Sequence, residues 1–118
     1  MILSEKITAV LGQLESRQIK FSDVIAFIEK HYSHIPTAFQ NGQQYNTAGE
    51  NQGSAKVLAF AMLNHLSKED TLKLFAEHYL AVLSFPDAGD HQNIRQFMQN
   101  GWEGVTFEGV ALQEKNEK

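Results

Sequence analysis

Side chains that could act as general acids or bases stand out in this sequence because other catalytic groups are missing. No cysteine is present and no serine follows the G-x-S-x-G pattern, so covalent acyl transfer lacks its usual nucleophile. General acid–base chemistry remains open, with Glu50, His78 and His91 as the groups that could move a proton. Arg95 is the best candidate for binding a carboxylate through two hydrogen bonds. The candidate catalytic residues are therefore Glu50, His78, His91 and Arg95.

Each of these groups also has a structural interpretation. His78 falls between the apolar side and the flank of a predicted helix, where histidine usually has a structural role. Asp90 stands at a predicted helix start, where a carboxylate caps free N–H groups as readily as it orients the neighbouring imidazole. The carboxylate that Arg95 would bind is Glu50, Glu77 or one that belongs to a ligand. The residue types alone leave both interpretations open.

An amide-rich stretch occupies residues 40–56, with the sequence QNGQQYNTAGENQGSAK. Gly49, Gly53 and Lys56 invite comparison with a phosphate-binding loop, because backbone N–H groups at a helix start attract anions. That loop needs four residues between the glycines and a lysine directly after the second, and neither condition is met. Glu50 would also repel a phosphate. The residues favour a glycine-bearing loop whose asparagine side chains bond to their own backbone.

One histidine pair has a spacing that could bind a metal ion. His31 and His34 are three residues apart and would lie on one helical turn. Pro36 follows closely, so the pair is expected at a helix end, where a cationic histidine interacts favourably with the helix dipole. We predict neither a metal site nor a cofactor.

Helical periodicity predicts five helices to position these groups. The second covers residues 23–32, with Phe21 placed to pack against Ala26 as a hydrophobic staple. The third, from residue 55, is apolar nearly all round and must be central to the core. The fourth runs past residue 80, and the fifth covers 91–100 and ends at Gly101. The predicted N-caps, in order, are Ser4, Ser22, Ser54, Ser67 in a capping box with Asp70, and Asp90.

Two strand-like segments accompany these helices. Residues 37–46 contain the dipeptide Asn41-Gly42, which favours a turn between extended pieces. Residues 105–112 alternate like two short strands broken by Gly109. The sequence therefore predicts an α+β fold, a single helix-rich domain over residues 1–112 with a small sheet from 37–46 and 105–112. Residues 113–118 are expected to form a frayed polar tail.

Composition limits the kinds of partner and the cellular location that are expected for this protein. The chain has 118 residues, 42% of them hydrophobic, and a net charge of −4 with ten scattered basic residues, which argues against a nucleic-acid partner. The longest apolar run, residues 57–63, is far shorter than the roughly twenty residues of a membrane helix, so no membrane partner is expected. The absence of cysteine and of a visible Sec-type signal favours a cytoplasmic location.

Several sequence blocks in a fixed order resemble the HopJ type III effector family. The blocks are PTAFQNG, NTAGENQGSAK, FAEHYLAVL, PDAGDHQNIRQFMQNGW and F-x-G-x-A-L, and the match extends over about residues 27–112. The resemblance implies a small bacterial protein, with no established activity, cofactor or catalytic residue to transfer. Secretion by a type III system is implied by the family name alone, and the regular helix expected over the first eighteen residues argues against it. The positions that the resemblance marks are Asn46, Gly49, Asn51, Gly53, Ser54, Lys56, Glu77, His78, Tyr79, Asp90, His91, Asn93, Arg95, Gly101 and Trp102.

These observations favour a binding or interaction protein, with an unknown small molecule or protein as its partner. The amide-rich loop and the helix start at DHQNIR would face each other across one polar cleft. The alternative is a small hydrolase or lyase that uses Glu50 or His78 as acid or base and Arg95 as an anion clamp. Glu50 and Arg95 are predicted to pair at one site, and Trp102 to be largely buried beside Phe97. The predicted binding residues are Asn46, Glu50, Asn51, Ser54, Lys56, His78, Asp90, His91, Asn93, Arg95 and Trp102.

Overall fold

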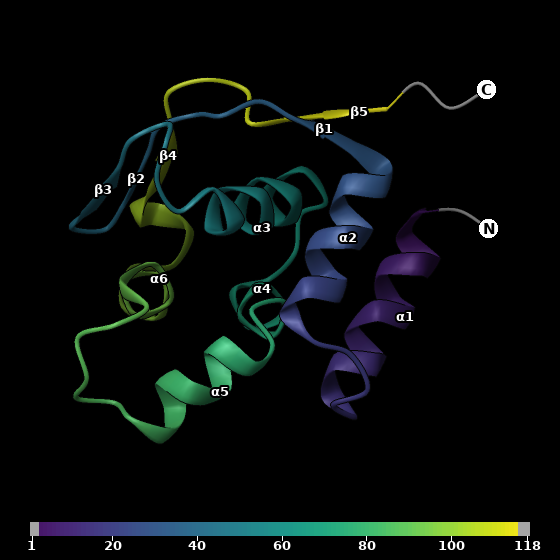
Figure 1. Ribbon diagram of the computed structural model, residues 1–118, viewed down its shortest axis with the longest axis horizontal. Coiled ribbons are helices and arrows are strands. Elements are labelled where there is room, and N and C mark those ends of the chain that lie inside the picture. Colours follow the sequence, from purple (N-terminus) through teal and green to yellow (C-terminus); the bar gives the residue numbers. More distant parts are fainter. Residues whose placement is uncertain (1–2, 116–118) are drawn as a thin grey trace.

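The central element of the fold is a helix that other elements surround on several sides (Figure 1). The structure, a computed structural model, describes residues 3–115. Its elements are α1 (Leu3–Glu15), α2 (Phe21–His31), β1 (Tyr32–His34), β2 (Phe39–Asn41), β3 (Gln44–Asn46), α3 (Gln52–Leu63), α4 (Lys68–Lys73), α5 (Glu77–Ser84), α6 (Gln92–Asn100), the 3-10 helix η1 (Gly101–Gly104), β4 (Val105–Phe107) and β5 (Leu112–Glu114). The predicted α+β class is confirmed.

Helix α3 forms the middle of the core, as its apolar composition predicts. The side chains of Val57, Leu58 and Phe60 are at most 1% exposed. The ring of Phe60 meets Phe27 of α2 and Tyr32 of β1 edge to face, at centroid distances of 5.9 and 5.6 Å. A helix that is apolar on all sides has to be enclosed, which explains why α2, α4 and the strands pack around it.

Two small antiparallel sheets lie along one side of α3, at the top of Figure 1. In the first, β2 is the middle strand and pairs with β3 and β4, as the segments 37–46 and 105–112 predict. In the second, β1 pairs with β5, and Tyr32 lies opposite Glu114. Strand β1 was not predicted, because its three residues read as the end of the preceding helix. Strand β5 runs through Glu114, past the predicted domain limit at residue 112.

Most predicted helix starts are displaced by a few residues. Ser67 is confirmed as an N-cap, since its hydroxyl accepts a hydrogen bond of 3.1 Å from the backbone N–H of Asp70. Ser4, Ser22 and Ser54 instead lie inside their helices. The N-cap positions of α2, α3 and α6 belong to Lys20, Asn51 and His91, so Asp90 is not the cap of α6. Helix α6 stops before Gly101, as predicted, although the φ of 61° and ψ of −152° at Gly101 differ from the left-handed cap expected there.

The predicted fourth helix is broken in two at Ala76. This residue has φ of 52° and ψ of −125°, a conformation that glycine adopts easily and other residues adopt only with strain. The break separates α4 from α5 and turns the following residues in a new direction. Nothing in the sequence indicates it, because alanine is the best helix former.

Replacing Ala76 by glycine is expected to raise the free energy of unfolding by about 1 kcal/mol, because the strain of a positive φ disappears. The same replacement at Ala81, within α5, is the matched control and should lower it by about 1 kcal/mol. Urea unfolding of both variants measures the difference. A loss of stability at both positions would contradict the strained conformation of Ala76.

No helix in residues 3–115 is long and apolar enough to cross a bilayer.

Candidate functional site

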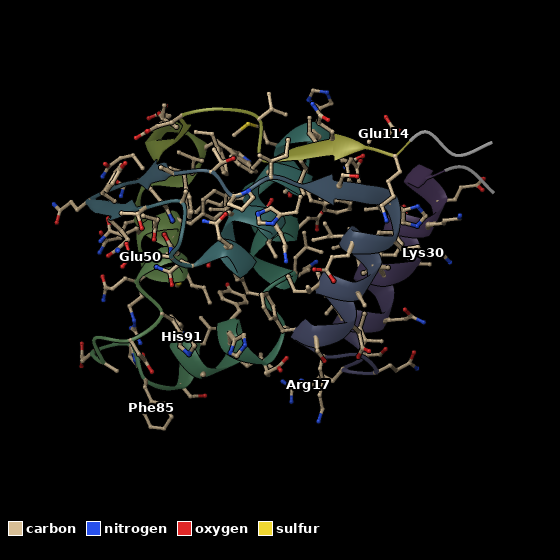
Figure 2. The ribbon with its side chains drawn as sticks, turned by 45° about the horizontal axis from the view of Figure 1, so that its top comes forward. Arg17, Lys30, Glu50, Phe85, His91 and Glu114 are labelled. Carbon is tan, nitrogen blue, oxygen red and sulfur yellow. The ribbon has the colours of Figure 1, made fainter. Side chains whose placement is uncertain are left out.

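A cavity of about 430 Å³ opens between the N-termini of α3 and α6, and we call it the histidine pocket. Figure 2 labels Glu50 and His91 on the two chain segments that meet here. Helix α5 and the start of α2 complete its walls. The predicted meeting of the amide-rich loop with the start of α6 is thus found in the structure. The lining residues are Phe21, Gln44, Asn51, Gly53, Ser54, Phe75, His78, His91, Gln92, Asn93 and Ile94.

Two imidazole rings meet inside this pocket. The rings of His78 and His91 have centroids 5.1 Å apart, and His78 also meets the ring of Phe21 edge to face at 4.9 Å. The direction of α5 after the break at Ala76 brings His78 to this wall. His91 is half-buried, and its Nε2 lies 3.9 Å from the Asp90 carboxylate. The pocket therefore holds two neighbouring imidazole rings, whose nitrogens can form hydrogen bonds with a ligand.

Two helix N-termini also face the pocket. Asn51 and His91, the N-cap residues of α3 and α6, both have left-handed backbones with φ of 52° and 51°. Neither helix start, both within the described residues, has a side-chain hydrogen bond as a cap. The first N–H groups of a helix lack intrahelical partners and carry the positive end of the helix dipole. Their lack of side-chain caps leaves these donors for water or a ligand.

Buried amide groups fix the floor between the two helices. The carbonyl oxygen of the Asn46 side chain accepts hydrogen bonds from the side chains of Asn51 (2.7 Å) and Asn93 (2.9 Å). The Nδ2 groups of Asn46 and Asn41 each donate to Asn93 Oδ1 at 3.1 Å. Asn41 and Asn46 have no exposed surface, and Asn93 is 6% exposed. One acceptor atom of β3 therefore ties α3 to α6 directly beneath the pocket.

The structure places the predicted binding residues in three groups. Asn51, Ser54, His78, His91 and Asn93 line the pocket. Asn46 is the buried acceptor beneath it. The other predicted residues, Glu50, Lys56, Asp90, Arg95 and Trp102, are not part of its lining.

The predicted pairing of Glu50 with Arg95 is wrong. The Glu50 carboxylate accepts hydrogen bonds from the N–H (3.2 Å) and hydroxyl (3.0 Å) of Thr47. The Arg95 guanidinium donates to the Asp90 carboxylate at 2.8 Å and to the backbone carbonyls of residues 85, 86 and 90. This hydrogen bond is the main cause that lowers the pKa of Asp90 below its usual value. Both side chains have partners close in sequence, so neither needs the other.

Lys56 and Trp102 also serve contacts away from the pocket. Lys56 Nζ forms an ion pair of 2.8 Å with Glu29 of α2, and its hydrogen bond lowers the pKa of Glu29. Trp102 packs edge to face against Phe97 at 4.9 Å, as predicted, and its indole N–H donates to the Leu66 carbonyl at 3.1 Å. Trp102, predicted to be largely buried, is partly buried and packs against the core. The ion pair accounts for Lys56, and ring packing with one hydrogen bond accounts for Trp102.

The aromatic part of the site was not predicted from the sequence. Phe21 and Phe75 line the pocket, where Phe21 was expected as a staple and Phe75 as part of a helix core face. The two rings are stacked with centroids 6.1 Å apart. A pattern of apolar spacing cannot separate a core ring from one that lines a cavity, so no sequence signal could have found them.

The histidines of the predicted helix-end pair are separated by a change of secondary structure. His31 is the last residue of α2 and contacts the ring of Phe27 at 4.8 Å. His34 lies in β1 and is hydrogen-bonded through Nε2 to Gln52 Oε1 at 3.1 Å. Among residues 3–115 no group of three or more His, Cys, Asp or Glu side chains could bind a metal ion together.

Comparison with known proteins identifies the family. The family model described as HopJ type III effector protein matches residues 7–112. A solved structure described as the unknown function protein VPA0580 is 46% identical in sequence, with a TM-score of 0.85. That match covers 98% of this chain and 95% of the other chain. No match was found among curated proteins. The family match covers most of the sequence, so this chain belongs to the HopJ type III effector protein family.

Proposed function

We propose that this HopJ family protein binds a small anion, a carboxylate or a phosphate group on a small molecule, in the histidine pocket. The observation that carries the proposal is the composition of the pocket wall. It combines two histidines with two helix N-termini that lack side-chain caps, and no Asp or Glu is found among its lining residues within 3–115. Such a wall attracts negative charge in a chain whose net charge is −4.

The groups that line the pocket suit an anion in detail. Imidazole nitrogens, the Ser54 hydroxyl and the amide groups of Asn51 and Gln92 can all donate hydrogen bonds to oxygen. The aromatic rings of Phe21 and Phe75 add an apolar surface for the remainder of the molecule. A volume of about 430 Å³ lies within the range of about 300–1,000 Å³ that is typical of small-molecule sites.

The acid–base alternative receives less support from this arrangement. It required Glu50 and Arg95 beside His78, but Glu50 is bonded to Thr47, and Arg95 to Asp90 and nearby carbonyls. Neither side chain lines the pocket. A proton-transfer site at this position would therefore consist of His78 and His91 alone. Binding explains the wall composition without requiring a reaction.

Sulfate is a suitable probe because it is a small oxyanion. We expect titration with sulfate to shift the backbone amide resonances of residues 51–54 and 91–94 in ¹⁵N-edited NMR spectra, and the shifts should saturate. Shifts spread evenly over the surface, without saturation, would refute the anion site.

A matched pair of histidine variants tests the site further. His91→Asn removes the imidazole, while asparagine still tolerates the left-handed backbone. His65→Asn is the control, because His65 is exposed, has φ of 55° and lies outside the pocket. Sulfate affinity should fall about tenfold in His91→Asn, consistent with one lost hydrogen bond to the anion, and stay unchanged in His65→Asn.

A further inference from the structure

A second cavity of about 380 Å³ lies between the C-terminal end of α1 and helix α5, and we call it the α1–α5 groove. Its floor is apolar and includes the buried Leu14 and the side chains of Ile19, Ala76, Tyr79 and Leu80. Its rim carries the charged residues Glu15, Arg17, Lys20, Lys73 and Glu77. The groove shares none of its lining residues with the histidine pocket.

The charged side chains on this rim differ in whether they have a hydrogen-bond or ion-pair partner. Glu15 accepts a hydrogen bond of 2.8 Å from Lys73, and Glu77 accepts one of 2.7 Å from the Phe21 backbone N–H. Arg17 and Lys20 have no side-chain hydrogen bond or ion pair to any of residues 3–115. Glu15 is therefore paired with Lys73, the Glu77 carboxylate keeps its charge, and Arg17 and Lys20 have no partner among the described residues at the mouth of an apolar cavity.

The backbone of Arg17 adds an independent observation. Helix α1 ends in a Schellman motif, with the N–H of Gln18 bonded to the carbonyl of Gln13 at 2.8 Å. Arg17 occupies the left-handed position of this motif, with φ of 60°, where glycine is the usual residue. Arginine is strained there, where glycine would not be. The strained backbone carries a guanidinium that has no hydrogen bond or ion pair to the described residues.

We propose that the α1–α5 groove binds a free long-chain carboxylate, with the carboxylate held by Arg17 and Lys20 and the alkyl chain on the apolar floor. The guanidinium of Arg17 has the planar geometry that binds a carboxylate through two hydrogen bonds. Leu80 and Leu83 are 38% and 51% exposed and stand three residues apart on the same side of α5. They extend the apolar surface from the groove and contact the chain beyond it.

Dodecanoate below its micellar concentration is the probe. We expect saturable binding by calorimetry, with ¹⁵N-edited NMR shifts at residues 14–20 and 76–80. Two control compounds should each bind at least about tenfold more weakly than dodecanoate. Butyrate has the carboxylate without the long chain, and dodecyltrimethylammonium has the long chain with the opposite charge. Equal binding of dodecyltrimethylammonium, or shifts confined to the histidine pocket, would overturn the proposal. Binding only to anionic lipid vesicles, or only to an acidic amphipathic peptide, would overturn it as well.

Substitution at Arg17 separates binding from stability. Arg17→Gly removes the charge and relieves the strained backbone, so dodecanoate affinity should fall about tenfold while the melting temperature is unchanged or higher. Lys20→Gln should also weaken binding. Lys30→Gln, at an exposed cation on α2 far from the groove (Figure 2), is the matched control and should bind dodecanoate normally. Unchanged affinity in both Arg17→Gly and Lys20→Gln would refute the carboxylate site.

Discussion

Replacing Asn46 by leucine is expected to lower the free energy of unfolding by about 2–4 kcal/mol, although the two side chains have similar volumes. The Asn46 amide is fully buried and exchanges hydrogen bonds with Asn93 in both directions. Its loss leaves the buried Asn93 amide without its Asn46 partner and also removes the acceptor for Asn51. Each buried polar group that loses its partner costs about 1–3 kcal/mol. Denaturant unfolding measures the change.

The control for this variant is Gln13→Leu, an equivalent exchange of an amide for leucine at an exposed position of α1. A change within about 0.5 kcal/mol is expected there. A double-mutant cycle of Asn46→Leu with Asn93→Leu should show a coupling of about 1–3 kcal/mol, because each change removes the other's partner. Additive losses would contradict the reciprocal amide pair.

The same variant is expected to affect the proposed anion site. Asn46 does not line the histidine pocket, but its carbonyl oxygen holds Asn51 and Asn93, which do. Without this acceptor the N-termini of α3 and α6 lose their shared attachment. Sulfate should then bind more weakly to the folded fraction of Asn46→Leu than to the parent protein.

Periodicity was sufficient to predict the main elements but not their ends. The apolar run in α3 could only fit a central helix, and the alternating residues of β4 and the turn of the β2–β3 hairpin were equally clear. The starts of α3 and α6 were misplaced because Asn51 and His91 adopt left-handed backbones, which the usual serine and aspartate caps do not. Strand β1 exists through its pairing with β5, about eighty residues later in the chain, which local pattern cannot reveal.

The sequence predicted many of the residues of the candidate site, but not which side chains contact one another. The polar stretches that form the histidine pocket are visible in the sequence, and five of the predicted residues line it. The pairing of Glu50 with Arg95 was predicted because charged residues are scarce in their segments. In the structure each side chain instead bonds to a residue close to it in sequence. Thr47 is three residues from Glu50 and Asp90 is five from Arg95. The break at Ala76, which directs His78, has no sequence signal.

Replacing Gly42 by alanine is expected to lower the free energy of unfolding by about 2 kcal/mol, since two separate costs add. Gly42 has φ of 59°, a left-handed conformation that strains alanine. A Cβ atom there would also collide with the side chains of Gln96 and Asn100. Moving Gln96 breaks the hydrogen bond of 2.9 Å that its side-chain oxygen accepts from the backbone N–H of Gln43.

Gly12→Ala is the control for this substitution, with the opposite sign. A Cβ atom at Gly12 meets nothing within 4 Å, and the residue lies inside α1 with an ordinary backbone. Alanine should therefore stabilise the protein by about 0.5–1 kcal/mol at this position. Gly42 also sets the turn of the hairpin that carries Asn41 and Asn46 to Asn93. If Gly42→Ala is as stable as the parent protein, the turn does not require glycine. The hairpin would then not hold the floor of the histidine pocket in the way that the structure indicates.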